Sequence, residues 1–282
     1  MLDILKTRAE LTRFLNERRS GISSIGLVPT MGALHEGHLS LVTRSAEEND
    51  LTVCSIFVNP TQFNDPSDLA RYPRPVESDI RKLTKTGCDL LFMPDAEEIY
   101  PEEESWHMEL GELERVMEGK FRPGHYQGVT QVVKKLFDLV APDRAYFGQK
   151  DYQQFLVIGE LVRQFSIPLE LICCPTQREA DGLAMSSRNI HLSPEERKEA
   201  VLLSKALFLI RSLANEMSPA EARDKGLELL GSSPLIQVEY LEIAHADTLR
   251  PVTDWNEASR VIALVAVRIG QTRLIDNLFI KH

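Results

Sequence analysis

Residues 25–42 read IGLVPTMGALHEGHLSLV, and this stretch decides the fold of the 282-residue chain. Its apolar start at 25–28 predicts a buried strand, and residues 37–49 predict an amphipathic helix. The turn between them therefore follows the carboxyl end of a strand and precedes the N-terminus of a helix. Unpaired N–H groups and the positive end of the helix dipole favour an anion at such a place. The stretch predicts a phosphate-binding turn.

Apolar runs alternate with amphipathic segments through about residue 175. Near-continuous apolar strands separated by helices are typical of a parallel sheet that is covered on both faces. We therefore predict an α/β fold with a Rossmann-like parallel sheet, in which ligands bind beyond the carboxyl ends of the strands. The predicted strands are 25–28, 51–58, 89–92, 145–147 and 169–174, and the predicted helices are 8–19, 37–49, 76–86, 128–140 and 151–164.

The pattern changes after residue 176. A capping box from Ser193 to Glu196 starts a helix that is predicted to continue toward Met217. Later runs alternate in the manner of strands in an antiparallel sheet. We predict a Rossmann-like domain at 1–176 and a smaller α+β domain with an antiparallel sheet at 177–282. The strands predicted in the second domain are 236–244, 260–267 and 273–279.

The charge balance is acidic, because 42 Asp and Glu residues stand against 32 Lys and Arg, a formal net charge of −10. An acidic surface lacks the electrostatic footprint of a general nucleic-acid-binding protein, so we expect no nucleic acid as a partner. The four cysteines contain no C-x-x-C pair, the first residues have no secretory apolar region, and no 18-residue apolar run follows. These features predict a cytoplasmic protein without a membrane segment.

Several well-known nucleotide and metal motifs are absent. The chain contains neither G-x-G-x-x-G nor G-x-x-x-x-G-K-[ST]. His35 and His38 are three residues apart, one fewer than in the zinc motif H-E-x-x-H, so a shared metal on one helical face is not expected. We expect both imidazoles to donate to phosphate, while Gly32 and Gly37 let the backbone approach the ligand. A glycine-rich turn with two surface histidines is the alternative.

Further polar segments lie at predicted strand or helix ends. Asn59 and Gln62 are suited to hydrogen-bond a polar substrate, although Asn-Pro also starts ordinary turns. Lys150 opposes the dipole of the helix that it starts, which indicates an anionic ligand. A basic, glycine-containing loop lies at 122–128, and hydroxyl, guanidinium and amide groups at 186–189 suit a phosphate clamp. A solvated lysine, a connecting loop and a simple turn are the alternatives for these segments.

Six strings of residues occur in order through nearly the whole chain and resemble the pantothenate synthetase family, the pantoate–β-alanine ligases of coenzyme A biosynthesis. The H-x-G-H element alone recurs across the wider nucleotidyltransferase superfamily, which includes class I aminoacyl-tRNA synthetases. The strings are PTMGALHEGHLSLV (29–42), FVNPTQF (57–63), YPR (72–74), FRPGHYQGVTQVVKKLF (121–137), YFGQKDYQQ (146–154) and DGLAMSSRN (181–189).

The resemblance implies a Rossmann-like N-terminal domain that binds nucleotide and pantoate, a C-terminal domain that acts as a lid, and a homodimer. It implies pantoate, β-alanine and ATP as substrates, with Mg²⁺ as the metal cofactor. In the implied reaction the pantoate carboxylate attacks the α-phosphorus of ATP, which gives enzyme-bound pantoyl adenylate and pyrophosphate. The amine of β-alanine then attacks the acyl carbon and AMP leaves.

The motifs also imply roles for single residues. His35, His38, Lys150 and Arg188 match catalytic positions, with His38 in the position of the family's proton donor. The substrate-binding positions are Asn59, Gln62 and Gln154, of which the two glutamines hold pantoate and Gln62 also lies near β-alanine. The ATP-binding segments match Met31, Gly32, Ala33, Leu34, His35, Glu36, Gly37, His38, Gly148, Gln149, Lys150, Asp151, Gln177, Met185, Ser186, Ser187 and Arg188.

The ligands of Mg²⁺ are not fixed by these motifs. Asp79 and Asp151 are the two carboxylates that we consider for this role. Away from the motifs, Asp79, Asp143 and the acidic run at 95–104 are predicted to be solvated surface.

Two other classes of function share part of the pattern. A nucleotidyltransferase that passes AMP or CMP to a phosphorylated acceptor uses the same pair of histidines but has no need of β-alanine. A nucleotide-sensing or tRNA-binding module binds without turnover, although the acidic balance and the lack of a basic stripe argue against RNA.

Overall fold

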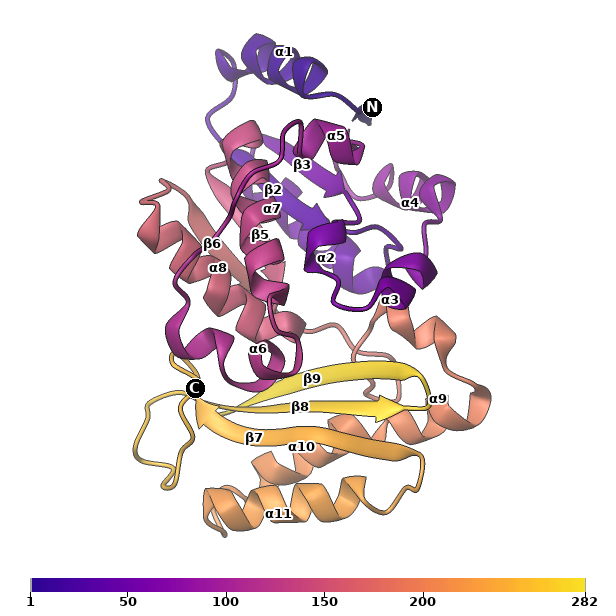
Figure 1. The fold of residues 1–282 in the computed structure, drawn as a ribbon, viewed down its shortest axis with the longest axis vertical. Coiled ribbons are helices and arrows are strands. Elements are labelled where there is room, and N and C mark those ends of the chain that lie inside the picture. The colour runs from indigo at the N-terminus through magenta and orange to yellow at the C-terminus, as the bar shows by residue number, and fades with distance from the viewer. Residues whose placement is uncertain (1, 282) are drawn as a thin grey trace. The chain divides into compact units, whose positions relative to one another are not determined.

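The computed structural model describes residues 2–281, which form two compact units. The first unit runs to Gly148 and continues over Gln153–Pro175, and the second consists of Gln149–Tyr152 and the chain from Thr176 onward. Figure 1 colours the first unit from indigo through magenta and most of the second in orange and yellow. A single boundary at residue 176 does not describe the short segment 149–152, which packs with the second unit.

The first unit contains a six-stranded sheet. Its strands are β1 (Asp3–Leu5), β2 (Ile25–Thr30), β3 (Leu51–Ile56), β4 (Leu90–Phe92), β5 (Arg144–Gly148) and β6 (Glu170–Cys174). Their order is β1-β4-β3-β2-β5-β6, and all neighbours are parallel. The predicted Rossmann-like parallel sheet is therefore confirmed.

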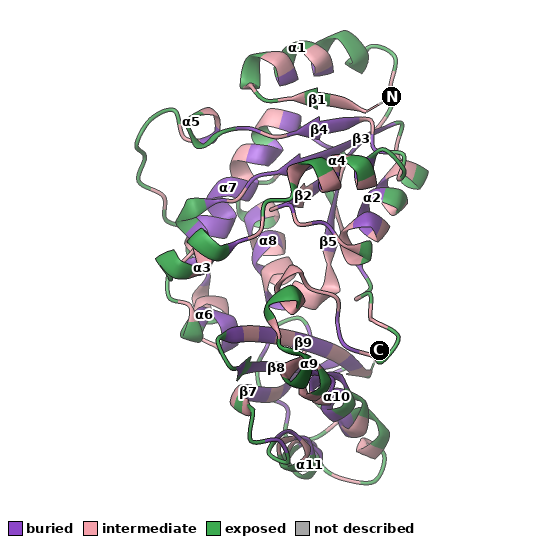
Figure 2. Cartoon of the chain, turned by 90° about the vertical axis from the view of Figure 1, so that its right-hand side faces the viewer, coloured by how far each residue is buried: buried purple, intermediate pink, exposed green. Residues whose placement is uncertain are grey.

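Helices cover both faces of this sheet because its strands are apolar on both sides. The helices are α1 (Arg8–Arg19), α2 (Glu36–Glu48), α3 (Pro66–Arg71), α4 (Val76–Leu83), α5 (Ala96–Ile99), α6 (Met117–Phe121), α7 (His125–Val140) and α8 (Tyr152–Gln164). Leu27 and Val53 belong to a core shared with α1, α7 and α8. Their neighbours Val28 and Cys54 belong to a second core with α2 and α4. Figure 2 shows buried residues along the strands between these helices.

Most predicted elements of this unit are present, with ends shifted by a few residues. Thr7 and Glu10 form a capping box that starts α1 where the pattern predicts it. Helix α7 begins at His125 instead of residue 128, directly after Gly124, which has a positive φ of 80°. The sequence pattern does not predict β1, α3, α5 or α6, because each is too short to show a hydrophobic period.

The second unit contains the antiparallel sheet that the sequence predicts. Its strands β7 (Ile236–His245), β8 (Val261–Ile269) and β9 (Thr272–Lys281) lie in that order. Its helices are α9 (Pro194–Ala200), α10 (Leu202–Leu213) and α11 (Pro219–Leu230). Leu207 and Ile210 of α10 share a buried core with Val265 of β8. This unit is therefore an α+β arrangement with its own core.

The prediction of one long helix toward Met217 is wrong. The chain forms two helices that meet at Val201, and α10 ends at Leu213. Val201 keeps helical dihedrals (φ −63°, ψ −22°), but its N–H donates to the carbonyl of Glu199. The helical hydrogen-bond pattern is therefore interrupted at Val201 although the backbone dihedrals stay helical. Capping residues and hydrophobic periodicity in the sequence do not reveal such an interruption.

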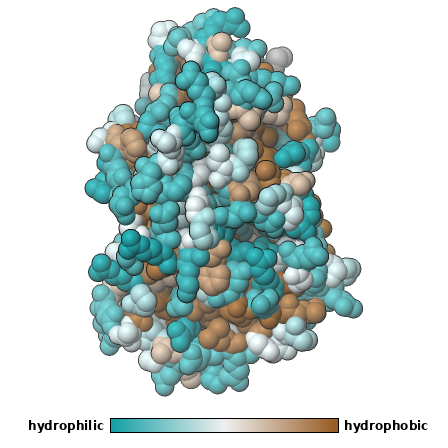
Figure 3. Space-filling model, viewed as in Figure 1, coloured by the Kyte–Doolittle hydropathy of each residue, from teal (hydrophilic) through white to brown (hydrophobic). Residues whose placement is uncertain are grey.

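No helix within residues 2–281 combines the length and the apolar character that crossing a membrane requires. The face in Figure 3 is mostly hydrophilic, with smaller hydrophobic areas.

The four cysteines are free thiols. Burial raises the pKa of Cys88 to about 12 and that of Cys54 well above its ordinary value, so both thiols stay protonated and pack as small apolar side chains.

Candidate active site

The strand order of the first sheet reverses at β2, which lies between β3 and β5. Thr30 at the end of β2 pairs with Ile56 at the end of β3, so the segments that follow them leave the same edge of the sheet as neighbours. Strand β5 ends at Gly148 on the other side of β2. Ligands of α/β sheets bind where the strand order reverses in this way. The predicted segments after β2 and β3 therefore leave the sheet at a known kind of ligand position.

The turn between β2 and α2 has an unusual backbone. Gly32 and Ala33 both have positive φ, 82° and 51°. Glycine adopts this conformation freely, but it costs a residue with a Cβ about 1 kcal/mol or more. Asp79 of α4 stabilises the turn by accepting the N–H of Ala33 at 2.8 Å and that of Leu34 at 2.9 Å. The ammonium of Lys82, one helical turn later, donates to the carbonyl oxygen of Leu34.

Asp79 is not the solvated surface residue that the sequence predicts. It is 1% exposed, and each carboxylate oxygen receives a backbone N–H. The signal for this role lies in the helix pattern, since Val76, Ile80 and Leu83 mark one face of α4 and Asp79 falls on the same face. A carboxylate on an apolar stripe indicates a buried partner.

His35 and His38 lie at the start of α2. His35 is the N-cap residue, and its Nδ1 accepts the N–H of Gly37 at 3.1 Å. Nδ1 of His38 accepts the N–H of His35 at 3.4 Å. A neutral imidazole that accepts at Nδ1 carries its proton at Nε2. The two rings, whose centroids are 4.1 Å apart, therefore each have an Nε2–H donor and need no positive charge to bind a phosphate oxygen.

Asn59 precedes the 3-10 helix η1 (Pro60–Gln62). Both the nitrogen and the oxygen of its side-chain amide form hydrogen bonds within the protein. It is 1% exposed, its Nδ2 donates to the carbonyl of Gly128 at 3.0 Å, and its Oδ1 accepts the Tyr100 hydroxyl at 2.8 Å. Burial raises the pKa of Tyr100, so its hydroxyl remains a donor. These contacts position the segment, and a substrate contact by Asn59 stays a prediction.

Gln62 has weaker partners. Its Nε2 donates to Sδ of Met31 at 3.2 Å, and its Oε1 accepts from Nδ2 of Asn59 at 3.2 Å. A thioether is a weak acceptor, so a substrate hydroxyl is a better partner for the same N–H. The contact with Met31 also joins Gln62 to the turn after β2. Gln154, the other amide predicted to bind pantoate, is half-buried in the first turn of α8.

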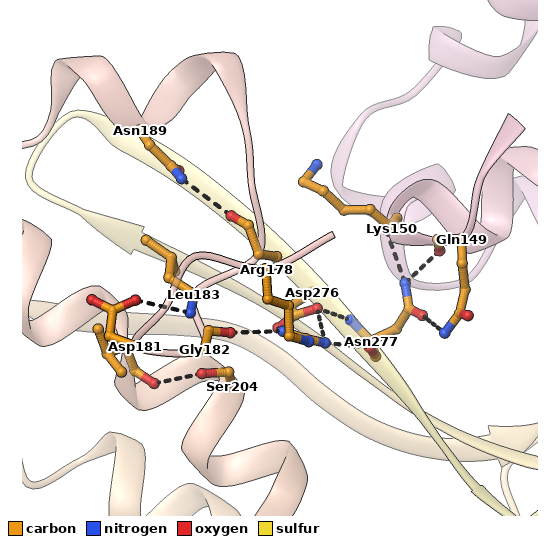
Figure 4. A network of polar contacts seen from close by, with 12 residues as sticks. Gln149, Lys150, Arg178, Asp181, Gly182, Leu183, Asn189, Ser204, Asp276 and Asn277 are labelled. Atoms are coloured by element: carbon orange, nitrogen blue, oxygen red, sulfur yellow. Dashed lines mark hydrogen bonds and ion pairs between the residues drawn. The ribbon is translucent and has the colours of Figure 1, made fainter. Parts of the chain in front are cut away.

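Residues Gln149–Asp151 form a short 3-10 helix that β9 holds within the second unit. Figure 4 shows that Asn277 makes this connection. Its Nδ2 donates to the carbonyl oxygens of Gln149 and Lys150 at 2.8 and 2.9 Å, and its Oδ1 accepts from Nε2 of Gln149 at 3.1 Å. Asn277 is only 2% exposed, so these bonds fix the main chain from which the Lys150 side chain extends.

Arg178 binds Asp276, the residue before Asn277 in β9, as Figure 4 also shows. Its guanidinium donates to both oxygens of Asp276 at 2.6 and 3.0 Å, and to the carbonyl oxygens of Gly182 and Asn277 at 3.1 and 3.2 Å. Asp276 is buried, which raises its pKa, and the hydrogen bonds from Arg178 oppose that shift. A bidentate pair has a defined geometry, so it fixes the strand beside Asn277.

The predicted phosphate clamp also lies in the second unit. The N–H of Met185 donates to the carbonyl oxygen of Gln177 at 3.0 Å. Ser186 is the N-cap of the 3-10 helix η4 (Ser187–His191), and its Oγ accepts the N–H of Arg188 at 3.3 Å. The structure therefore brings these predicted ATP-segment residues together within one unit.

Comparison with known proteins identifies the family. A family model described as Pantoate-beta-alanine ligase matches residues 3–279. The pantothenate synthetase of Bacteroides thetaiotaomicron is 46% identical over 281 residues, which cover 100% of each chain. That of Moorella thermoacetica is 47% identical over 282 residues, which cover 99% of each chain. This chain belongs to the pantoate-beta-alanine ligase family. The family resemblance and the ligase class predicted from the sequence are thereby confirmed.

Solved structures of the pantoate-beta-alanine ligase family share the fold. Pantothenate synthetase from Thermus thermophilus matches with a TM-score of 0.93 and 46% identity over 99% of this chain and 100% of that one. The pantoate-beta-alanine ligase of Francisella tularensis, solved with beta-gamma ATP and beta-alanine, matches with a TM-score of 0.81 and 35% identity over 99% and 98% of the chains.

Asp79 and Asp151, the two carboxylates considered for Mg²⁺, do not fit a metal site made of protein groups. Within residues 2–281, no group of three or more His, Cys, Asp and Glu side chains is arranged to hold a metal ion. Both oxygens of Asp79 accept backbone N–H groups. Oδ2 of Asp151 lies 3.6 Å from the ammonium of Lys150. Each carboxylate is therefore engaged by another group in this ligase.

Sequence reasoning missed Asp276 and Asn277 as supports of the Lys150 segment. They form an adjacent polar pair inside the apolar run LIDNLFI, residues 274–280. Side chains of neighbouring residues in a strand point to opposite faces. Two polar residues in succession therefore place a polar group on each face of an otherwise apolar strand, which is a signal that partners exist.

We predict that Asp79→Asn lowers kcat/KM for ATP about tenfold. One of the two N–H groups then faces an amide –NH₂ instead of an oxygen, and an unpaired buried polar group costs about 1–3 kcal/mol. The control is Glu77→Gln, the same chemical change at an exposed position of α4. Steady-state kinetics with ATP varied provide the measurement. A folded Asp79→Asn variant with normal kcat/KM for ATP contradicts the role given to this carboxylate.

We also predict that Asn277→Asp lowers kcat about tenfold. The carboxylate removes the donors for the main-chain carbonyl groups of Gln149 and Lys150, so it shifts the segment that carries Lys150, a residue that the sequence predicts to be catalytic. Asn256→Asp makes the same change at an exposed site. Circular dichroism establishes that both variants are folded before turnover is compared. Equal turnover in the two variants excludes the positioning role of Asn277.

Proposed function

We propose that this member of the pantoate-beta-alanine ligase family joins pantoate to β-alanine with ATP, through a pantoyl adenylate. A carboxylate oxygen of pantoate attacks the α-phosphorus, and pyrophosphate leaves with the electron pair of the broken P–O bond. The amine of β-alanine then attacks the acyl carbon and loses a proton, and AMP leaves with the electron pair of the C–O bond. The products are pantothenate, AMP and pyrophosphate.

One observation carries this proposal: a turn at the reversal point of the strand order holds two imidazoles with Nε2–H donors beside the start of a helix. A carboxylate and a triphosphate repel each other, so the protein first has to hold two anions within reacting distance. Fixed donors serve this purpose because they are oriented before the reaction starts. His35 and His38 are assigned to the phosphates, and His38 takes the position of the family's proton donor.

We assign further phosphate contacts to residues of the second unit. Lys150 and Arg188 supply positive charge, and Ser186 and Ser187 supply hydroxyl donors. Asn277 fixes the main chain at Lys150. The cap of η4 fixes the main chain at Ser186, Ser187 and Arg188. Phosphoryl transfer asks for little covalent chemistry from the protein, so positioning and charge stabilisation account for catalysis.

We assign the pantoate hydroxyls to Gln62 and Gln154. Neutral amides bind hydroxyl groups without adding charge near the reacting carboxylate. The Met31 thioether is a weak partner for Nε2 of Gln62, which a hydroxyl can replace. The complex of the Francisella tularensis ligase with beta-gamma ATP and beta-alanine supports ATP and β-alanine as the other two substrates.

Further parts of the proposal rest on the family resemblance. The second unit serves as the lid, because an acyl adenylate is sensitive to water. Mg²⁺ is proposed to enter on the ATP phosphates, since it commonly binds through substrate phosphates and keeps several waters. The protein is proposed to act as a homodimer. Four free thiols support the cytoplasm as its compartment.

Isotope transfer tests the adenylate. With pantoate carrying ¹⁸O in its carboxylate, we expect one labelled oxygen in the phosphate of AMP, because that oxygen bridges the acyl carbon and the phosphorus. Mass spectrometry of AMP measures the label. Unlabelled AMP formed together with pantothenate eliminates this route. A parallel reaction without β-alanine separates the ligase from a nucleotidyltransferase, since only the ligase forms an amide when β-alanine is added.

We predict that Lys150→Ala and His38→Ala each lower turnover about a hundredfold or more, as loss of one oriented charge-stabilising donor does. Lys85→Ala, at an exposed position, serves as the control. The measurement is the rate of AMP release at saturating substrate. Near-normal rates in both folded variants would contradict the roles assigned to these two residues.

A further inference from the structure

The loop that the sequence analysis identifies at 122–128 forms the start of α7 and contacts the helix η1 that carries Gln62. His125, the first residue of α7, is 5% exposed. Its Nδ1 lies 2.8 Å from the carbonyl oxygen of Gln62. Its Nε2 lies 3.1 Å from Nη1 of Arg122. The function proposed above leaves this histidine without a role.

Two hydrogen-bond partners, Arg122 and the carbonyl of Gln62, determine where the ring proton of His125 lies. A guanidinium has only donors, so Nε2 has to accept the hydrogen bond from Arg122. The carbonyl of Gln62 has only acceptor lone pairs, so Nδ1 has to carry the proton and donate it. Both bonds are satisfied by the neutral imidazole with its proton at Nδ1. This is the opposite tautomer from that of His35 and His38.

Gly128, on the same face of α7, fixes η1 a second time. A Cβ at this position would lie 2.4 Å from the carbonyl oxygen of Thr61 and 2.7 Å from the backbone nitrogen of Gln62. The carbonyl oxygen of Gly128 accepts from Nδ2 of Asn59. The first turn of α7 therefore contacts the peptide group before Gln62 and the one after it.

We propose that His125 is a positioning residue for Gln62, with Arg122 selecting the tautomer that can do so. The inference rests on the proposed function, in which the Gln62 amide binds pantoate. The partners of that amide are a weak thioether acceptor and the Asn59 side chain, so the direction of the amide depends on where its own backbone is held. His125 acts on pantoate through Gln62 and has no direct part in the reaction.

The test compares two side chains of similar size at position 125. In His125→Asn, an amide –NH₂ occupies the place of Nδ1 and keeps the donor for the Gln62 carbonyl. His125→Leu removes the donor. We expect His125→Leu to raise KM for pantoate about tenfold, as an unpaired buried carbonyl does, with KM for ATP unchanged. His125→Asn is expected to recover most of the affinity. His107→Leu, at an exposed position, is the control.

A double-mutant cycle with Gln62→Ala shows whether the effect passes through that side chain. We expect His125→Leu to have no further effect on KM for pantoate when Gln62 is already Ala. Equal rises of KM for pantoate and ATP, or a full additional effect in the Gln62→Ala background, overturn the positioning role. Should His125→Leu not fold, His125→Gln displaces the same donor with a polar side chain that suits a helix, and the same outcomes apply.

The same cycle separates failure of this inference from failure of the proposed function. If Gln62→Ala alone leaves KM for pantoate unchanged, the assignment of Gln62 to pantoate fails, and the role of His125 fails with it. If Gln62→Ala raises KM and His125→Leu adds to it independently, only the positioning role is excluded.

Discussion

A buried carboxylate that accepts two consecutive backbone amides sets the geometry on which the candidate site depends. Asp79 holds the N–H groups of Ala33 and Leu34 while the chain passes through two residues with positive φ. Without that interaction the turn has little reason to remain in a conformation that is unfavourable for alanine. The conformation of this turn fixes the first residue of α2, and the start of α2 fixes the positions of both imidazoles. A single residue on a neighbouring helix thus controls the placement of several others.

Much of the fold could be predicted from the sequence, because apolar periodicity reports which faces of an element are buried. The parallel sheet, its covering helices and the later antiparallel sheet all follow from that signal. The missed elements were short, such as β1, or depended on one hydrogen bond, as at Val201. The motifs pointed to the residues at the sheet edge, but not to Asp79, Asp276 and Asn277. These three act through partners that are distant in sequence, and only their polarity on apolar faces indicated them.

A common design links the supports in the two units. Asp79, His125 and Asn277 each hydrogen-bond to the main chain of a segment that carries a proposed site residue. Main-chain anchoring fixes these segments without adding another partner to the side chains of Gln62 and Lys150, whose own contacts are with Met31, Asn59 and Asp151. The energetic benefit is preorganisation, since the segments lose their conformational freedom on folding and not on binding.

The membership of residues 149–152 in the second unit means that the polypeptide crosses between the units at Gly148, at Tyr152 and again at Pro175. The units are consequently linked by three covalent connections, unlike domains that are joined by one flexible tether. A fragment ending at Pro175 would retain the lysine loop but lose the strand that anchors it. The two units are therefore inseparable by simple truncation, and a functional dissection of the protein has to leave the backbone intact.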